Sequence, residues 1–354
     1  MSIVELARPE IQALRPYEAA EQVDDTIRLN ANESPEVCTA AKFRRPLNRY
    51  PEVRPKRLQN GLAERFGCAP GELLVTRGSS EAIDLVIRTF CRAGVDNIVT
   101  HTPSFSMYRH YAAVQGATVT EVRTKAEQDF RIDVGALLAE CGPETRVLFV
   151  CSPNNPTGTL LPVADLEKLL EGRSESSAVV VDEAYVEFAD TPSVTALLDR
   201  YPNLLVLRTL SKALGFAGAR CGAVIGQAGV ISMLSAVQAP YALATPVVEC
   251  VEDALGTEGE AAALVERIVA ERERLASCLS GFEFVHRVWP SAANFLLAEF
   301  EDAAAITQHC ERRKILLRRI GGDLADCVRI SVGSASENDC LLQALETFSE
   351  THCG

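Results

Sequence analysis

The stretch LLVLRTLSKALGFAGARCG at residues 204–222 decides the fold that the sequence predicts. It begins with four apolar residues in succession, which is typical of a strand buried on both faces of a parallel sheet. Lys212 follows this run closely, and Arg220 comes eight residues later. Open α/β sheets hold their ligands at the carboxyl ends of their strands. The stretch therefore predicts an amine and an anion-binding arginine at such an end. A lysine in a solvated loop has the same local pattern. The choice between a loop lysine and a ligand-binding lysine therefore depends on the residues upstream.

Composition and charge limit the classes of partner. The length of 354 residues suggests about two domains, and 47% hydrophobic and 23% charged residues are ordinary for a globular protein. A net charge of −13 disfavours nucleic acids and anionic membranes as main partners. No apolar run is long enough for a membrane span, and the first residues lack the apolar core of a signal peptide. We therefore expect a cytoplasmic protein.

Cysteine and histidine are scattered along the chain. The 12 cysteines contain no Cys-x-x-Cys pair, and the five histidines show no spacing of metal ligands. Without a secretory signal, the cysteines are expected to be reduced. No metal site is predicted.

Strands and helices alternate in the first two thirds of the chain. The predicted strands cover residues 73–75, 97–101, 117–122, 146–151, 178–182 and 204–207. Helical periodicity marks residues 57–66, the segment after 78, and residues 163–170. Alternation of this kind predicts a doubly wound α/β domain with a mostly parallel sheet.

The pattern changes near residue 245. Long helical patterns cover residues 246–280, strand-like segments follow at 282–288, 294–299 and 328–332, and a last helix is expected at 337–348. This order predicts a separate α+β domain. We therefore divide the chain into an N-terminal arm (1–28) that packs with the small domain or a partner subunit, a large domain (29–245) and a small domain (246–354).

Polar groups follow four of the predicted strands. They are Asn155, Asp182 with Tyr185, Lys212, and the turn GSS at residues 78–80. Each has an ordinary structural explanation as a turn, a helix cap or a core residue. Together they supply every part of a site for pyridoxal 5′-phosphate. A lysine forms a Schiff base with its aldehyde, a buried carboxylate keeps its pyridine nitrogen protonated, and a helix N-terminus with hydroxyls and an arginine suits its phosphate. Phe105 is an aromatic residue that could stack on the ring.

At this point the sequence resembles the fold type I, class I and II aminotransferases and, within that family, the branch that acts on histidinol phosphate. The matching motifs occur in the family's order and are LNANE (29–33), NRYP (48–51), CSPNNPTG (151–158), VDEAYVEF (181–188), RTLSKA (208–213), ARCG (219–222), APY (239–241) and VRISVG (328–333). The resemblance implies a PLP-dependent transferase of fold type I, with a large, doubly wound, mostly parallel seven-stranded sheet domain and a smaller α+β domain. The turn GSSE at 78–81 departs from the commoner Gly-Ala-Asp/Asn-Glu type, and serine hydroxyls with backbone N–H groups can still bind a phosphate there.

The resemblance also implies roles for individual residues. The catalytic residues would be Lys212, which moves a proton between Cα and C4′ of the adduct, with Asp182 and Tyr185. Cofactor contacts would come from Ser79, Ser80, Phe105, Asn155, Asp182, Tyr185, Thr209, Ser211, Lys212, Arg220 and, from the neighbouring subunit of a homodimer with shared sites, Tyr50. Substrate contacts would come from Tyr17, Asn32, Tyr241, Arg318 and Arg329. Arg319 adjoins Arg318, and strand alternation allows only one of the two to point inward.

The implied reaction transfers the amino group of L-histidinol phosphate to 2-oxoglutarate in histidine biosynthesis. An aromatic amino-acid aminotransferase and a threonine-phosphate decarboxylase use the same scaffold, and the cofactor motifs do not separate these possibilities. A nicotinamide-dependent Rossmann enzyme would need Gly-x-Gly-x-x-Gly after the first strand, and this string is absent. A PLP-sensing regulator would need a DNA-binding domain, for which the arm is too short and not basic.

Overall fold

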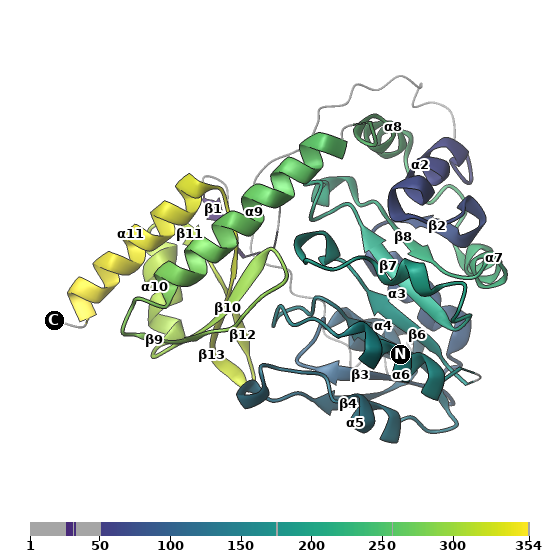
Figure 1. Cartoon of the computed structure of the whole chain (residues 1–354), viewed down its shortest axis with the longest axis horizontal. Coiled ribbons are helices and arrows are strands. Elements are labelled where there is room, and N and C mark those ends of the chain that lie inside the picture. Colours follow the sequence, from purple (N-terminus) through teal and green to yellow (C-terminus); the bar gives the residue numbers. More distant parts are fainter. Residues whose placement is uncertain (1–25, 31, 33–50, 175, 257, 353–354) are drawn as a thin grey trace, which may run out of the picture.

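Two main β-sheets and the helices packed on them make up the part of the chain that the structure describes (Figure 1). The computed structural model describes residues 26–30, 32, 51–174, 176–256 and 258–352. Most of the predicted arm lies outside these residues, and so do Tyr17 and Tyr50.

The larger sheet has seven strands. In spatial order they are β2 (Leu73–Thr76), β8 (Gly222–Ile225), β7 (Leu204–Thr209), β6 (Ala178–Asp182), β5 (Thr145–Cys151), β3 (Asn97–Thr102) and β4 (Thr118–Arg123). All run in one direction except β8, which is antiparallel to both of its neighbours. The predicted fold, a mostly parallel seven-stranded α/β sheet, is confirmed. The strand β8 is not among the predicted strands, because its sequence GAVI continues a segment of small residues.

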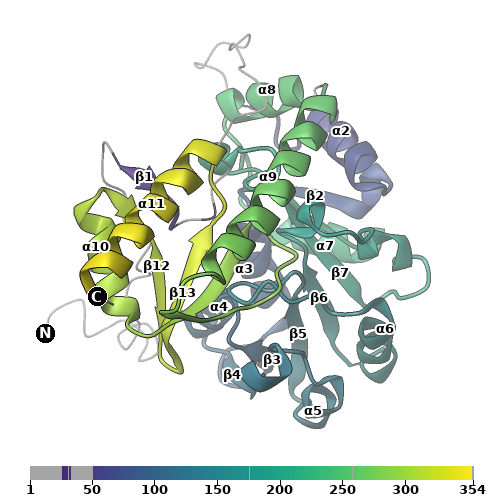
Figure 2. The same cartoon turned by 60° about the vertical axis from the view of Figure 1, so that its left-hand side comes forward.

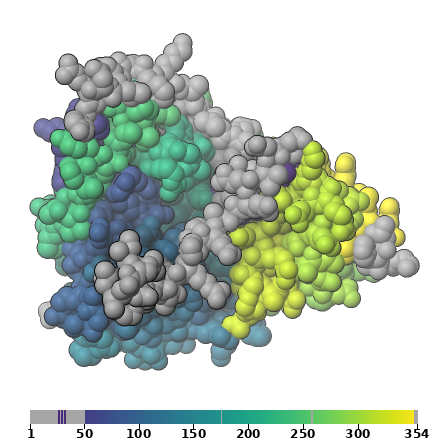
Figure 3. Space-filling view, turned by 180° about the vertical axis from the view of Figure 1, so that it is seen from behind, coloured from purple at the N-terminus to yellow at the C-terminus, as the bar shows by residue number. Residues whose placement is uncertain are grey.

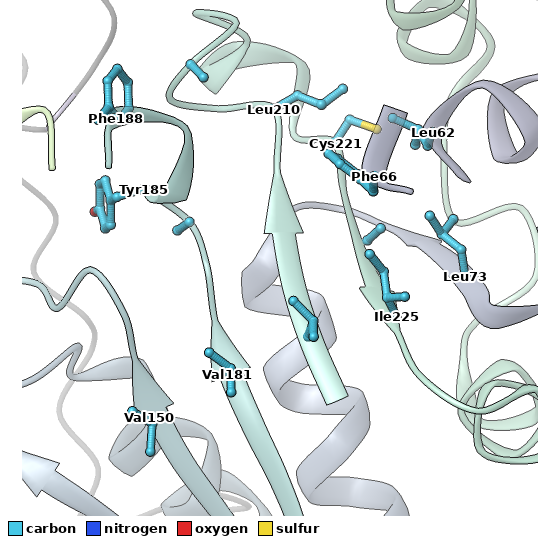
Figure 4. Packing of buried hydrophobic residues seen from close by; sticks show 14 of the residues in the cluster. Leu62, Phe66, Leu73, Val150, Val181, Tyr185, Phe188, Leu210, Cys221 and Ile225 are labelled. Atoms are coloured by element: carbon cyan, nitrogen blue, oxygen red, sulfur yellow. The ribbon is translucent and has the colours of Figure 1, made fainter. Parts of the chain in front are cut away.

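Helices cover both faces of this sheet because successive strand residues point to opposite sides. On β6, Val179 and Val181 join one buried cluster, which contains residues of α2 (Lys56–Phe66), α5 (Val134–Ala139), α6 (Val163–Gly172) and α8 (Thr245–Ala254). Val180 points to the other face and joins a cluster with residues of α3 (Ser79–Phe90), α4 (Met107–Gln115) and α7 (Ala228–Val237). Figure 4 shows Val150 and Val181 of the first cluster on adjacent strands.

The second sheet is antiparallel and has four strands. Their spatial order is β12 (Arg318–Gly321), β13 (Leu324–Ser331), β10 (Phe295–Phe300) and β9 (Val285–Val288). Its outer face packs against α9 (Glu258–Leu279), α10 (Ala303–Arg312) and α11 (Ala335–His352) through a third buried cluster (Figure 2). Leu296 and Ile330 are paired residues that point into this cluster. Their sequence neighbours Leu297 and Arg329 therefore lie on the opposite face, toward the larger sheet.

A short parallel pair joins the start of the described chain to the second sheet region. The strand β1 (Ile27–Arg28) pairs with β11 (Ile315–Leu316), and the amide of Ser331 donates to the carbonyl of Leu29 at 2.9 Å. The strands β11 and β12 and the helix α10 are not among the predicted elements. The division of the chain at residues 28/29 and 245/246 stays a prediction. Figure 3 shows the two parts from behind, with the second sheet and its helices as a separate lobe.

The two sheets are held together by a small apolar cluster and by polar contacts. Phe130 and Trp289 lie 5.2 Å apart between ring centroids, and Leu324 belongs to the same cluster. An ion pair of 2.7 Å between Arg123 on β4 and Asp323 in the β12–β13 turn crosses between the sheets. The contacts fix the β12–β13 hairpin, and hence Arg318 and Arg329, relative to the larger sheet.

The closest backbone approach between the two parts predicts the effect of one substitution. Gly158 has φ of +76°, a Cβ there would lie 2.8 Å from the Cα of Ser291, and its carbonyl accepts from the Ala292 amide at 2.9 Å. Gly158→Ala should therefore lower the free energy of unfolding by about 1–2 kcal/mol for the left-handed backbone and about 1–3 kcal/mol more for the overlap. Denaturant unfolding measures this loss.

Gly94→Ala is the matched control, because Gly94 also has a positive φ (+69°) but no atom within 4 Å of its Cβ position. This variant should show only the backbone part of the loss. Equal destabilisation by the two substitutions would contradict a tight contact at Gly158.

Candidate active site

A cavity of about 1270 Å³ lies at the carboxyl ends of the central strands and faces the second sheet. Most of the predicted site residues in the described part of the chain line it: Asn32, Ser79, Ser80, Phe105, Asn155, Asp182, Tyr185, Thr209, Ser211, Lys212, Arg220, Arg318 and Arg329. Tyr241 is not among the lining residues; its side chain is 44% exposed, and its backbone has φ of +57°. The structure thus brings together residues separated by about 300 positions in the sequence.

The carboxylate of Asp182 lies at the buried end of β6. Its Oδ2 accepts a hydrogen bond from the Tyr108 hydroxyl at 2.9 Å, and its Oδ1 accepts from the Ala184 amide at 3.2 Å. Burial raises the pKa of Asp182 to about 6, against the lowering effects of these two hydrogen bonds and of the Lys212 charge. A positively charged group placed against this carboxylate would relieve the cost of burying it.

Sequence reasoning missed Tyr108. This tyrosine is buried on α4, stacks on Phe149 with 4.7 Å between ring centroids, and meets the ring edge of Phe105 at 5.8 Å. Its hydrogen bond orients the carboxylate of Asp182, and both Tyr108 and Phe105 line the cavity. No local pattern singled it out, because Phe105 lies before α4 and the partner Asp182 is 74 residues away in the chain.

Tyr185 and Asn155 lie side by side in the lining of the cavity. The Tyr185 hydroxyl accepts from Nδ2 of Asn155 and from Nδ2 of Asn32, both at 3.3 Å. The Tyr185 ring meets Phe295 edge-on at 5.2 Å. Burial raises the pKa of Tyr185 to about 12, so the hydroxyl keeps its proton at neutral pH and can donate it to an acceptor in the cavity.

Arg329 reaches from β13 to the same part of the cavity lining. Its Nη1 donates to Oδ1 of Asn155 at 2.6 Å, and its Nη2 donates to the carbonyl of Asn30 at 3.1 Å. Its guanidinium lies 5.5 Å from the ring centroid of Phe295. A planar guanidinium fixed in this way suits a carboxylate or a phosphate.

Strand register answers which of two adjacent arginines faces the cavity. Arg318 on β12 pairs directly with Arg329 on β13. Directly paired residues point to the same face, so both guanidinium groups lie on the cavity side. Arg318 lines the cavity, whereas Arg319 is exposed and does not.

An anion cradle forms at the start of α3. Gly78 is the N-cap with φ of +74°, and a Cβ there would lie 2.9 Å from Nη2 of Arg220. Nη1 of Arg220 donates to the Ser211 hydroxyl at 3.4 Å, and the Thr209 hydroxyl donates to the same oxygen at 3.0 Å. Hydroxyls, a guanidinium and the N-terminus of a twelve-residue helix therefore converge on one spot.

Glu81 in the first turn of α3 does not oppose an anion there. Its carboxylate turns back, accepting from the Arg77 amide at 2.6 Å and pairing with the Arg77 guanidinium at 2.8 Å. The cradle therefore keeps its positive character.

Lys212 lies three residues after Thr209, the last residue of β7, and lines the cavity. Its Nζ is 5.7 Å from the ring centroid of Tyr185. The amine therefore has Asp182 and Tyr185 as neighbours on the adjacent strand end. Among the described residues no group of three or more His, Cys, Asp or Glu side chains could hold a metal ion, and no helix there is long and apolar enough to cross a membrane.

Comparison with known proteins places this geometry in a family. A family model described as aminotransferase class I and II matches residues 18–345. The chain belongs to this family. A histidinol-phosphate aminotransferase from Xylella fastidiosa (strain 9a5c) is 40% identical over 352 residues, 97% of this chain and 96% of the relative. The predicted family and enzyme class are thereby confirmed.

Solved structures agree with this fold. Histidinol-phosphate aminotransferase from Sinorhizobium meliloti, in complex with pyridoxal-5′-phosphate, has a TM-score of 0.83 at 24% identity and covers 97% of each chain. L-threonine-O-3-phosphate decarboxylase from Porphyromonas gingivalis has a TM-score of 0.77 at 22% identity, covering 92% of this chain and 99% of that chain. At these identities the two structures support the fold alone.

Pyridoxal phosphate is the cofactor of the class I and II aminotransferases, as the sequence predicted. The residues of this chain fit it. The buried carboxylate of Asp182 suits a protonated ring nitrogen, the cradle at Gly78 and Arg220 suits a phosphate, and Lys212 lines the same cavity as Asp182 and Arg220.

The raised pKa of Asp182 predicts how stability depends on pH in the cofactor-free protein. The folded-state pKa of about 6 exceeds the ordinary 3.8, so the ionised carboxylate destabilises the fold above pH 6, and this penalty disappears as pH falls toward 4. Asp182→Asn should therefore raise the free energy of unfolding at pH 8 by up to about 3 kcal/mol. Urea unfolding at pH 8, 6 and 4.5 should show this gain shrinking as the pH falls.

Asp326→Asn is the control, because Asp326 is exposed on β13. It should change little at any of the three pH values. A gain in D182N that stayed the same from pH 8 to pH 4.5 would show that ionisation of Asp182 is not its cause.

Proposed function

We propose that the protein is a histidinol-phosphate aminotransferase, which transfers the amino group of L-histidinol phosphate to 2-oxoglutarate and yields imidazole-acetol phosphate and L-glutamate. The observation that carries the proposal is the pair of arginines, Arg318 and Arg329, opposite one another on β12 and β13 in the lining of the cavity. The 40% identity with a full-length relative of that name supports it. Such an enzyme would work in histidine biosynthesis, and we propose a cytoplasmic location.

The charge of the cavity favours anionic substrates. Seven cationic side chains line it within the described residues: Arg109, Arg123, Lys125, Lys212, Arg220, Arg318 and Arg329. Four anionic side chains accompany them: Glu121, Glu127, Asp182 and Asp323. The whole chain carries a net charge of −13, so this local excess of positive charge opposes the overall field. It would favour a phosphate ester and a dicarboxylate over neutral amino donors.

In our proposal the cofactor residues divide the work by position. Asp182 would keep the ring nitrogen protonated, and Tyr108 and the Ala184 amide hold that carboxylate in place. Asn155 and Tyr185 would donate to the ring oxygen. The phosphate would be bound by Ser79, Ser80, Thr209, Ser211 and Arg220, joined by Tyr50 of the neighbouring subunit. Phe105 would stack on the ring.

The same residues account for proton transfer. Pyridoxal phosphate, when bound, supplies an aldehyde for covalent attachment to an amine and a ring that takes up an electron pair. Lys212 would be the amine that holds the cofactor in the resting enzyme, and its freed amine would serve as the acid and base that moves the proton from Cα of the amino donor. Lys212 lines the cavity, with its Nζ 5.7 Å from the ring centroid of Tyr185.

One site would serve two substrates because guanidinium groups bind both carboxylate and phosphate. Arg329 and Arg318 would hold the phosphate of histidinol phosphate, with Asn32, Tyr17 and Tyr241 completing the pocket. In the second half-reaction Arg329 would hold the α-carboxylate of 2-oxoglutarate. A single site used in turn predicts ping-pong kinetics.

We also propose a homodimer with shared sites. Several large apolar or aromatic side chains on and near α7 are exposed, and a second copy would cover them: Val53, Met233, Val237 and Tyr241, at 47%, 48%, 38% and 44% exposure. Arg54 donates to the carbonyl of Ser235 at 2.8 Å, which places the segment after Tyr50 beside α7.

A single-turnover spectrum tests the reaction. PLP-loaded protein is mixed with L-histidinol phosphate in the absence of any keto acid, and the absorbance of the bound cofactor should change to that of pyridoxamine phosphate. Steady-state rates with phenylalanine and tyrosine should be lower. Conversion by glutamate or an aromatic donor but not by histidinol phosphate would identify a related aminotransferase. Release of carbon dioxide from threonine phosphate would identify a decarboxylase.

Arg318 provides a prediction about specificity. Arg318→Ala should raise KM for histidinol phosphate about 10–100-fold, because one of two charged partners of the phosphate is lost, and should change KM for glutamate less. Steady-state kinetics with both donors measure the difference. Arg319→Ala is the matched control at the exposed neighbouring position and should keep both KM values. Equal effects of the two substitutions would contradict the inward placement of Arg318.

A further inference from the structure

A buried arginine outside the cavity connects two segments that carry site residues. Arg272 lies on α9 and is 8% exposed. Its Nη1 donates to the carbonyl of Phe188 at 3.1 Å and to the carbonyl of Ala293 at 3.0 Å. The other side of the guanidinium pairs with Glu273 at 2.9 Å. One nitrogen atom thus joins a segment of the larger sheet to a segment of the second sheet.

The first segment carries the cofactor side of the site. Phe188 is the last residue of the short helix η4 (Val186–Phe188), which begins directly after Tyr185. Figure 4 shows Tyr185 and Phe188 next to each other beyond the end of the strand that carries Val181. A hydrogen bond to the Phe188 carbonyl therefore fixes the turn that aims the Tyr185 hydroxyl.

The second segment carries the substrate side. Ala293 precedes Asn294 and Phe295, and Nδ2 of the Asn294 side chain donates to the carbonyl of Asn32 at 3.2 Å. The rings of Phe295 and Tyr185 are nearly perpendicular, with 5.2 Å between their centroids. The Arg329 guanidinium lies over the Phe295 ring, 5.5 Å from its centroid. Displacement of this segment would move Asn32 and Arg329 relative to Tyr185.

We propose that Arg272 is a positioning residue for the reaction, and that its paired hydrogen bonds to Phe188 and Ala293 set the distance between the cofactor side and the substrate side of the site. Both carbonyls lie in buried surroundings, where a lost donor leaves a polar group without a partner. Few side chains other than arginine combine the reach and the number of donors needed to bind two carbonyls and a carboxylate at once.

The predicted effect of Arg272 on substrate binding rests on the proposed function. Its predicted effect on the bound cofactor does not. The experiment therefore has two readouts. The first is the pH titration of the absorbance of the bound cofactor, measured without any amino donor. The second is KM for histidinol phosphate. A failure of histidinol phosphate as donor would overturn the proposed function and leave the titration to decide the role of Arg272.

The variant Arg272→Met should keep the fold, since methionine fills much of the buried space, and should change both readouts. If the Tyr185 hydroxyl is less well positioned, its hydrogen bond stabilises the ionised ring oxygen of the cofactor less. The midpoint of the titration should therefore rise by about half a pH unit or more. KM for histidinol phosphate should rise about tenfold. Arg272→Lys should give smaller changes in the same directions.

A double substitution separates positioning from a general loss of stability. In the Tyr185→Phe background the effect of R272M on the titration midpoint should largely disappear, because Arg272 acts there through the Tyr185 hydroxyl. Arg274→Met is the matched control on the same helix. Arg274 is 37% exposed, and its ion pairs, each 2.8 Å, go to Glu271 and to Asp339 on α11.

R274M should therefore leave the midpoint and KM unchanged, whatever it does to the unfolding temperature. Wild-type values of both readouts in folded R272M, or in R272K if R272M does not fold, would overturn the proposal. Equal shifts in R272M and R274M would overturn it too, since they would show a structural effect of α9 alone.

Discussion

The burial of one carboxylate is the constraint on which the rest of the site depends. Asp182 is 2% exposed, and burial raises its pKa even though Tyr108 and the Ala184 amide both donate to it. An ionised group in such surroundings is stable only when an opposite charge faces it. A protonated pyridine nitrogen would meet this need, and its charge would offset the cost of burying Asp182. The ends of β5, β6 and β7 bring Asn155, Asp182 and Lys212 to the lining of one cavity.

Alternation along the strands gives the ends of β6 and β7 one side that faces the cavity and one that does not. Asp182 and Thr209 line the cavity. Their chain neighbours Glu183 and Arg208 are buried and do not line it. Arg208 pairs with Glu183 at 3.5 Å and with Glu187 at 2.7 Å, and its guanidinium lies 4.6 Å from the ring centroid of Phe66. A buried ion pair adds little net stability but fixes geometry. It ties the end of β6 to the end of β7 from beneath the site.

The second sheet contributes specificity because its free face turns toward the cavity. The helices α9, α10 and α11 cover its outer face. Alternate residues of each strand point to that face, and the residues between them point toward the larger sheet. Arg318 and Arg329 are directly opposite one another on β12 and β13, and both side chains lie on this face. The hairpin that carries them is held by Arg123 and Asp323 at its turn and by Phe130 against Leu324. In the proposed function, substrate preference would therefore depend on contacts between the two sheets, whereas most of the proposed cofactor residues belong to the larger sheet.

The sequence by itself determined the α/β sheet and the chemistry at its edge. Apolar runs mark buried strands, parallel strands end at a common edge, and Asn155, Asp182 and Lys212 each follow such a run. Only the tertiary structure decided that Arg318 rather than Arg319 faces inward, because the pairing of Arg318 with Arg329 sets that choice. The same holds for the hydrogen bond from Tyr108 to Asp182 and for Arg272, whose carbonyl partners lie 84 and 21 residues away in the chain. Local pattern identifies which residues stand at a strand end, but contacts between distant segments have no local signal, since packing alone brings them together.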